Sequence, residues 1–181
     1  MKRVLFILGL LADTDVEWLV GAGKKRMLSV GESLVTEGIA LDSLFIVLDG
    51  LLGVIIQKDG KPLEVDSIGA GEVVGEVSLL DSRPPTATVT CKEESVVLQV
   101  SHLALQSKFD TDEGFAARFF RALAVFLAHR FRHRVSGLGY TGSQELDEKT
   151  RSPDEIDVSV LDNVVLAGAR FRWMLDRLKN T

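Results

Sequence analysis

The sequence has few of the residues that cross-link or stiffen a chain, with one cysteine and four prolines in 181 residues. Cys91 cannot form a disulfide within one chain, and a metal site built on two cysteines of that chain is excluded. We therefore expect a reducing, cytoplasmic compartment. Glycine does not recur at every third position and no heptad pattern is sustained, which excludes collagen-like and long coiled-coil structures.

Positive charge is also scarce. The chain has 21 Lys and Arg against 26 Asp and Glu, a net charge of −5. Because binding to the phosphates of nucleic acid needs clustered Lys and Arg, the chain as a whole is not expected to bind DNA or RNA. Hydrophobic residues make up 46% and charged residues 26% of the chain. This composition excludes disorder for most of it and predicts one globular domain with at most a small appendage.

The N-terminal apolar run is too short to span a bilayer. Its nine largely apolar residues, 4–12, follow a basic start and imitate a short signal peptide. The small residues that precede a cleavage site are missing, so we favour a pair of core helices. In that interpretation Asp13 or Thr14 caps a second helix that ends near Gly21 or Gly23.

The middle of the chain has the pattern of short antiparallel strands. Eight of the 16 glycines lie from Gly31 to Gly75, and the runs between them are apolar or alternating, as in a sandwich or barrel. Asp59-Gly60 predicts a tight hairpin turn. The strands are expected at 26–30, 34–36, 43–49, 52–57, 63–68, 86–92 and 95–100.

A long helix is expected over 111–135, capped by Thr111 or Asp112. The apolar residues at helical spacing that predict its buried face are Phe115, Phe119, Leu123 and Phe126. The apolar residues beside that face, which predict a homodimer through this helix, are Phe120, Leu127 and Phe131. Near its end, Arg130 with His129 and His133 is typical of a solvated helix terminus. The alternative, a metal bound by the two histidines, lacks a visible third ligand.

These patterns predict a mainly β fold with flanking helices. The expected architecture is an antiparallel β-roll, a jelly-roll-like double-stranded β-helix, with N-terminal helices and the long helix, over residues 1–136. Residues 137–153 are expected to be a linker, and residues 154–181 a helical extension.

The strongest functional signal is the segment from Ile68 to Val89, which reads IGAGEVVGEVSLLDSRPPTATV. Gly75 to Ser78 is expected to open a short helix, whose first amide groups lack partners and attract anions. Gly75 lets the backbone approach a ligand closely, and the carboxylate of Glu76 can accept hydrogen bonds from a ribose hydroxyl. An arginine from the far side of the loop would neutralise a phosphate there.

At these residues the sequence resembles the cyclic nucleotide-binding domain family, found in the bacterial catabolite activator and in regulatory subunits of cyclic-nucleotide-dependent kinases. The resemblance covers about residues 5–136, including the run from Leu44 to Gly50. It implies a non-catalytic sensor or regulatory module whose ligand is cAMP or cGMP, with no cofactor required. The ligand-binding residues that it implies are Gly75, Glu76, Val77, Ser78, Arg83, Thr86 and Ala87.

One position departs from the family pattern. The resemblance places the phosphate-binding arginine where this chain has Pro85, which offers neither charge nor an amide donor. Arg83, two residues earlier, either bends back to the phosphate, points to solvent or pairs with Asp81. Glu76 either binds the ligand or only favours the short helix. Thr86 either supplies a hydroxyl, as the resemblance implies for relatives that prefer cGMP, or is an ordinary strand residue. We therefore expect weak binding of cyclic nucleotides.

The sequence shows no catalytic machinery, because neither a G-x-S-x-G setting nor a G-x-x-x-x-G-K-[ST] loop is present. A catabolite-activator-like regulator would continue into a helix-turn-helix, for which the roughly 40 residues after Tyr140 are few. Residues 142–181 hold six basic and eight acidic residues, so we expect neither DNA nor membrane as a partner. The alternative to a sensor is a scaffold whose roll has lost nucleotide binding and whose helices, 112–135 and 154–179, bind an unknown protein.

Overall fold

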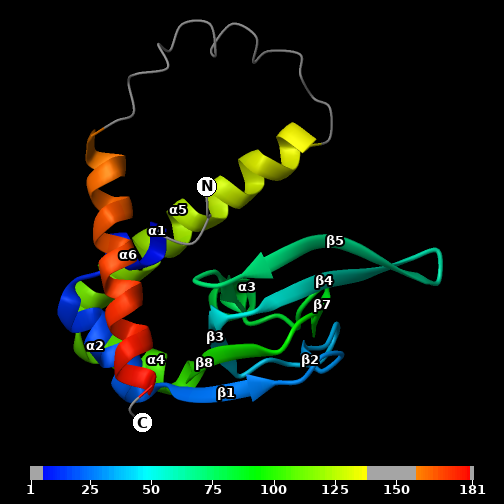
Figure 1. The fold of residues 1–181 in the computed structure, drawn as a ribbon, viewed down its shortest axis with the longest axis horizontal. Helices are drawn as coiled ribbons and strands as arrows, with labels where there is room; N and C mark the ends of the chain where they lie inside the picture. The colour runs from blue at the N-terminus through cyan, green and yellow to red at the C-terminus, as the bar shows by residue number, and fades with distance from the viewer. Residues whose placement is uncertain (1–5, 138–157, 180–181) are drawn as a thin grey trace, which may run out of the picture.

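The computed structural model describes residues 6–137 and 158–179, and it places a β-roll beside a group of helices (Figure 1). The strands are β1 Lys24–Leu28, β2 Ser33–Val35, β3 Ser43–Asp49, β4 Leu51–Lys58, β5 Lys61–Gly69, β6 Val73–Val74, β7 Thr88–Cys91 and β8 Ser95–Ser101. The helices are α1 Phe6–Leu10, α2 Asp13–Ala22, α3 Glu76–Asp81, α4 His102–Thr111, α5 Glu113–Gly137 and α6 Val158–Lys179.

Two four-stranded antiparallel sheets form the roll. Their strand orders are β1-β8-β3-β6 and β2-β7-β4-β5, which confirms the predicted mainly β, antiparallel β-roll. The hairpin between β4 and β5 turns at Asp59 and Gly60, both at positive φ (53° and 73°). The Asp-Gly pair predicted this turn because these residues tolerate the left-handed region.

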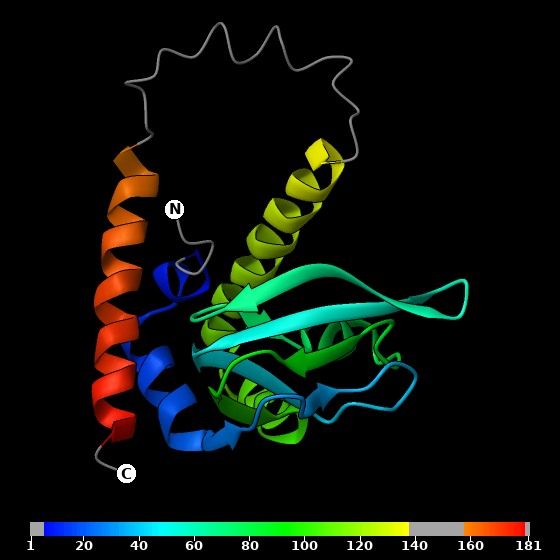
Figure 2. The ribbon, with the colours of Figure 1, turned by 45° about the vertical axis from the view of Figure 1, so that its right-hand side comes forward.

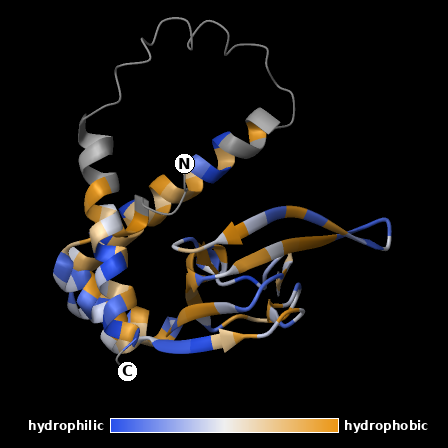
Figure 3. Ribbon diagram, viewed as in Figure 1, coloured by the Kyte–Doolittle hydropathy of each residue, from blue (hydrophilic) through white to orange (hydrophobic). Residues whose placement is uncertain are grey.

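Strand β3 is buried on both faces and separates two parts of the core. Leu44, Ile46 and Leu48 belong to the cluster shared with the helices, whereas Phe45 and Val47 point into the roll. All residues of this strand except Asp49 are buried, which explains why the run from Leu44 to Leu48 is continuously apolar (Figure 3).

Helix α5 lies against the roll with the predicted face buried. Phe115, Phe119, Leu123 and Phe126 are each at most 3% exposed. Asp112 caps the helix, since its Oδ1 accepts a hydrogen bond from the Phe115 amide at 2.8 Å, and this prediction is confirmed.

The N-terminal region folds as predicted into two helices, α1 and α2, but the predicted cap is wrong. Neither Asp13 nor Thr14 precedes the helix; Ala12 does, and its amide donates to Oδ2 of Asp15 at 2.7 Å. A carboxylate three residues into the helix thus replaces the expected side-chain cap. Helix α2 ends before Gly23, as expected.

Other local features also differ from the sequence prediction. Strand β7 begins at Thr88 rather than residue 86, and the two prolines before it, which lack amide donors, leave Thr86 in the preceding loop. Strand β1 starts two residues earlier than expected. The two-residue strand β6 and helix α4 were not predicted. Helix α4 begins after Ser101, whose hydroxyl accepts a hydrogen bond from the Ala104 amide.

Helix α6 packs against α1 and α2 on the side away from the sheets (Figure 2). It buries Ala167, Met174 and Leu178 in the core cluster of the helices. The predicted linker from residue 138 onward and the start of the predicted extension, 154–157, lie outside the described residues, so the domain boundaries stay predictions. No helix in the described part of the chain has the length and apolarity that a bilayer crossing requires.

Candidate functional site

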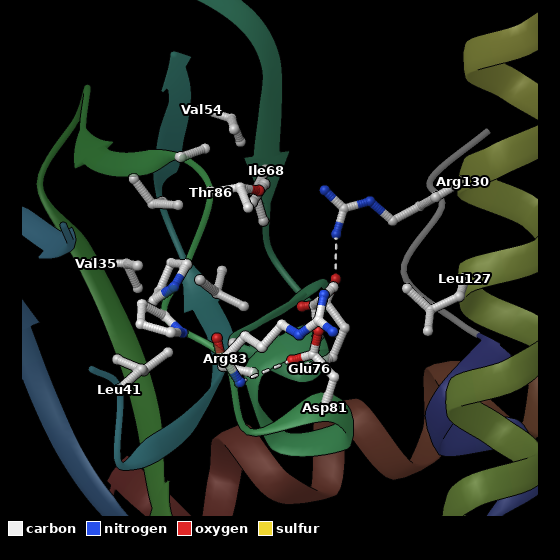
Figure 4. A pocket seen from close by; sticks show the side chains of 18 of the residues that line it. Val35, Leu41, Val54, Ile68, Glu76, Asp81, Arg83, Thr86, Leu127 and Arg130 are labelled. Atoms are coloured by element: carbon white, nitrogen blue, oxygen red, sulfur yellow. Dashed lines mark hydrogen bonds and ion pairs between the residues drawn. The ribbon is translucent and has the colours of Figure 1, made fainter. Parts of the chain in front are cut away.

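A cavity of about 790 Å³ opens between the sheet β2-β7-β4-β5, helix α3 and helix α5 (Figure 4). Such a volume is within the range of small-molecule sites. Its walls are mostly apolar. The apolar residues that line it are Val35, Leu41, Val54, Ile56, Val65, Ile68, Val74, Val77, Pro84, Pro85, Ala87, Val89, Leu127 and Phe131.

The structure brings all the predicted site residues to this one cavity. Helix α3 and the residue before it contribute the first group, and the loop between α3 and β7 contributes the second. The predicted site residues that line the cavity are Gly75, Glu76, Val77, Ser78, Arg83, Thr86 and Ala87. The two segments, 75–78 and 83–87, are separated in sequence by residues 79–82 and line the same cavity.

Gly75 fixes the entry of the chain into α3. Its φ is +92°, in the left-handed region. A Cβ at this position would lie 2.8 Å from the carbonyl oxygen of Ser43. Glycine is therefore favoured here both by the positive φ and by the close approach to β3. A side chain at this position would shift the start of α3.

Glu76, the first residue of α3, is 4% exposed. Its Oε1 accepts a hydrogen bond from Nη1 of Arg130 on α5 at 2.7 Å. In Figure 4 Arg130 extends from α5 toward Glu76, so the ion pair joins two walls of the cavity. A buried carboxylate needs such compensation, because burying it unpaired is costly.

The sequence placed Arg130 at a solvated helix terminus, and this prediction is wrong. The Arg130 side chain is 19% exposed and lines the cavity. Its guanidinium lies over the ring of Phe126, 5.4 Å from the centroid, and its Nη2 is 3.9 Å from Oδ2 of Asp66 on β5. A partner 54 positions away in the chain left no sequence signal, so only the folded structure identifies this residue.

Arg83 lies in the exposed loop that follows α3. Its backbone amide donates to Oδ1 of Asp81 at 3.0 Å. The predicted contact between these two residues therefore exists, but through the backbone of Arg83. The guanidinium of Arg83 is directed toward the cavity side of the loop in Figure 4.

Pro85 is half-buried and lines the cavity at the position where the resemblance requires an arginine. Its carbonyl oxygen accepts a hydrogen bond from the Gly38 amide at 2.8 Å. Thr86, the next residue, is exposed in the loop. The hydrogen bond to Gly38 thus holds the segment in place. The side chain of Pro85 is apolar, so it adds no positive charge to the cavity wall.

A metal site receives no support from the described residues. Within residues 6–137 and 158–179 no group of three or more His, Cys, Asp or Glu side chains could hold an ion. The side chain of residue 133 lies outside those described, so the pairing of His129 with His133 is not placed.

The chain is similar to known proteins in both sequence and fold. The model of the cyclic nucleotide-binding domain family matches residues 25–112. A cAMP-dependent protein kinase type II regulatory subunit from Drosophila melanogaster is 30% identical over 59 residues. That match spans 33% of this chain and only 16% of the length of the relative.

Two solved structures are similar to this chain in sequence and fold. The N-terminal domain of a transcriptional regulator from Streptomyces coelicolor A3(2) is 27% identical with a TM-score of 0.62, over 72% of this chain and 95% of that chain. The regulatory domain of Toxoplasma gondii PKA, solved with cAMP, is 25% identical with a TM-score of 0.53, over 58% of this chain and 42% of that chain.

Proposed function

Residues 25–112 of this chain belong to the cyclic nucleotide-binding domain family, and on that premise we propose that the protein is a non-catalytic sensor or regulatory module. Its ligand is a small molecule held in the cavity between α3, the β-roll and α5, with cAMP and cGMP as the candidates. The observation that carries the proposal is the convergence of the seven site residues on one cavity.

The chemistry of the cavity supports a nucleotide-like ligand of modest affinity. The apolar inner face of the β2-β7-β4-β5 sheet suits the flat body of a base. Gly75 permits close approach of a ligand to the backbone at α3. Pro85 removes the charge-assisted contact to a phosphate, and such a contact is worth roughly 1.5 to 3 kcal/mol. Binding of cAMP or cGMP is therefore micromolar or weaker.

A scaffold that has lost nucleotide binding is the second candidate, and Pro85 is the observation that favours it. In that case the cavity is a remnant and the helices carry the function by contacting another protein. A homodimer through α5, a cytoplasmic location and the absence of DNA binding remain parts of the first proposal.

Isothermal titration of the protein with cAMP, cGMP and c-di-GMP tests the two candidates. A sensor shows saturable binding of cAMP or cGMP in the micromolar range. If none of the three binds at millimolar concentration, the sensor proposal fails and the scaffold is retained.

A further inference from the structure

We propose that the cavity favours an uncharged, largely apolar ligand over an anionic one. The inference rests on the proposed function, since it names the chemical class of ligand for the same cavity. Three features of the cavity carry it: the side chains of its inner walls, the side chains of its rim, and the balance of the charges that line it.

The inner walls offer a ligand mostly hydrocarbon. Fourteen of the 21 residues that line the cavity are apolar. Val35, Val54 and Val89 come from three strands of the same sheet, and each is at most 6% exposed. All three belong to the core cluster inside the roll, so the floor of the cavity continues that core. A ligand gains free energy there in proportion to the apolar surface that it buries.

The rim of the cavity is apolar as well. Val65 on β5 is 41% exposed, Val77 on α3 is 53% exposed and Phe131 on α5 is 70% exposed. These three side chains line the cavity, so they stand where it meets solvent. Apolar side chains exposed together are typical of a surface that binds something. A ligand that covers them removes apolar surface from water.

The charged side chains that line the cavity balance one another. Arg83 and Arg130 are its cationic lining residues, and Glu76 and Asp81 are its anionic ones. Glu76 and Arg130 form the polar end of the cavity, where Oε1 and Nη1 are 2.7 Å apart. Nη2 of Arg130 is also 3.9 Å from Oδ2 of Asp66. Arg83 is exposed, so water screens its charge. An anion entering the cavity therefore meets little net attraction.

These three features decide the class of ligand. An anionic group must leave water to enter, which is costly unless a cation replaces the lost hydration. Pro85 supplies no such cation. An uncharged molecule does not have this cost, and it keeps the full gain from covering the walls and the rim. An uncharged ligand therefore binds more tightly than an anionic ligand of the same shape.

The experiment uses two fluorescent probes that share an aromatic skeleton and differ in charge. N-phenylnaphthylamine is uncharged, whereas anilinonaphthalenesulfonate carries a sulfonate, and both gain fluorescence at apolar sites. Titration of the full chain gives the two dissociation constants. We expect the uncharged probe to bind at least about fivefold more tightly in the parent. In Pro85→Arg this ratio is expected to fall about tenfold, because the new cation attracts only the sulfonate.

A matched pair of variants on β5 shows whether the probes bind in the cavity. Val65 and Leu63 are 41% and 42% exposed, but only Val65 lines the cavity. Val65→Glu is expected to weaken binding of the uncharged probe at least about fivefold, and Leu63→Glu to change it by less than about twofold. Ala87→Phe is a second variant, which fills the cavity from the loop before β7 and is expected to weaken both probes.

Adenosine and cAMP repeat the comparison with ligands of the proposed function, because they differ in the cyclic phosphate. Titration calorimetry is expected to give adenosine a dissociation constant no larger than that of cAMP in the parent. In Pro85→Arg the order is expected to reverse, since the phosphate then gains its charge-assisted contact.

The outcomes separate this inference from the proposed function. If the parent binds cAMP tenfold more tightly than adenosine, or the anionic probe more tightly than the uncharged one, the inference fails and the proposed function stands. An uncharged probe that binds Val65→Glu and Ala87→Phe as it binds the parent lies outside the cavity and overturns the inference too. Binding of the uncharged probe in the cavity without binding of cAMP or cGMP rejects these nucleotides as ligands and supports the ligand class. If no probe, nucleoside or nucleotide binds, the inference and the proposed function fail together.

Discussion

The carbonyl oxygen of Pro85 accepts a hydrogen bond from the amide of Gly38 at 2.8 Å. This contact joins the loop after α3 to the loop between β2 and β3. It uses only backbone atoms, so it does not depend on the side chain at position 85. An arginine at this position can therefore keep the loop in place while it reaches the cavity that Pro85 now lines.

Pro85→Arg is expected to tighten binding of cAMP and cGMP. Restoring one charge-assisted contact to the phosphate is worth roughly 1.5 to 3 kcal/mol, which corresponds to about a 10- to 150-fold gain in affinity. Titration calorimetry measures it. Pro84→Arg, which adds the same charge one residue earlier, is the matched control, and an equal gain there would show that register at position 85 is irrelevant.

Arg83→Ala is expected to change cAMP affinity by less than about threefold. Arg83 is exposed and two residues from the expected register, and its backbone amide bond to Asp81 survives the substitution. Its effect on the free energy of unfolding stays within about 0.5 kcal/mol, as for most surface positions. Submicromolar affinity in the parent that collapses in this variant would show that Arg83 has taken over the phosphate.

The ion pair between Asp15 of α2 and Arg118 of α5 is expected to make the free energy of unfolding depend on pH in the acidic range. Burial by itself raises the pKa of Asp15, but hydrogen bonds from Arg118 and from the Ala12 amide bring the pKa below its usual value. An Asp whose pKa is lower in the folded state stabilises the fold at pH values above its unfolded-state pKa of about 3.9. This stabilisation is lost as the pH falls through the folded-state pKa.

Asp15→Asn tests this contribution by urea unfolding at pH 7 and near pH 3. At pH 7 it is expected to cost about 1 to 2 kcal/mol, less than a fully buried pair because Arg118 is 40% exposed. Near pH 3 the difference between parent and variant narrows. Asp110→Asn, at an exposed carboxylate on α4, is the control; a loss in Asp15→Asn that is constant across this range would contradict the assignment.

A homodimer through α5 is expected, because α5 exposes more apolar surface than a helix packed on one side needs. Phe131 is 70% exposed, Phe120 41% and Val125 39%. Light scattering of the parent is expected to give a dimer mass that Phe131→Glu reduces. Leu103→Glu, at an 82% exposed position of α4, is expected to leave the mass unchanged. A strictly monomeric parent at high concentration disproves the prediction.

Sequence-specific DNA binding tighter than about micromolar at physiological salt is not expected. One basic side chain of helix α6, that of Arg170, is used within the fold. Arg170 is 13% exposed, bonds to Oδ1 of Asp13 and donates to the carbonyl oxygens of Leu8 and Gly9. Fluorescence anisotropy with a random-sequence duplex and with a pool of selected sites measures the affinity for DNA. A site bound at nanomolar concentration would falsify the prediction.

The sequence by itself determined the features that depend on neighbouring residues. The run from Ser43 to Asp49 is a strand with the predicted bounds, Asp59-Gly60 turns the hairpin, and Asp112 caps α5. In each case the cause acts within a few residues: side-chain periodicity, a tolerated positive φ, or a cap three residues from its donor. The segment from Ile68 to Val89 was identified for the same reason, because its residues are contiguous.

Only the tertiary structure decided which distant groups meet. Arg130 and Glu76 are 54 positions apart, and Asp15 and Arg118 are 103 apart. Helical periodicity predicted that Arg130 faces solvent. Because α5 packs on the roll, Arg130 instead lines the cavity and lies beside a buried carboxylate. Partners at this separation are selected by how helices and sheets pack, and one sequence carries no local pattern that records it. The polar end of the cavity was therefore decided by the fold, while its loop and glycine turn were already visible in the chain.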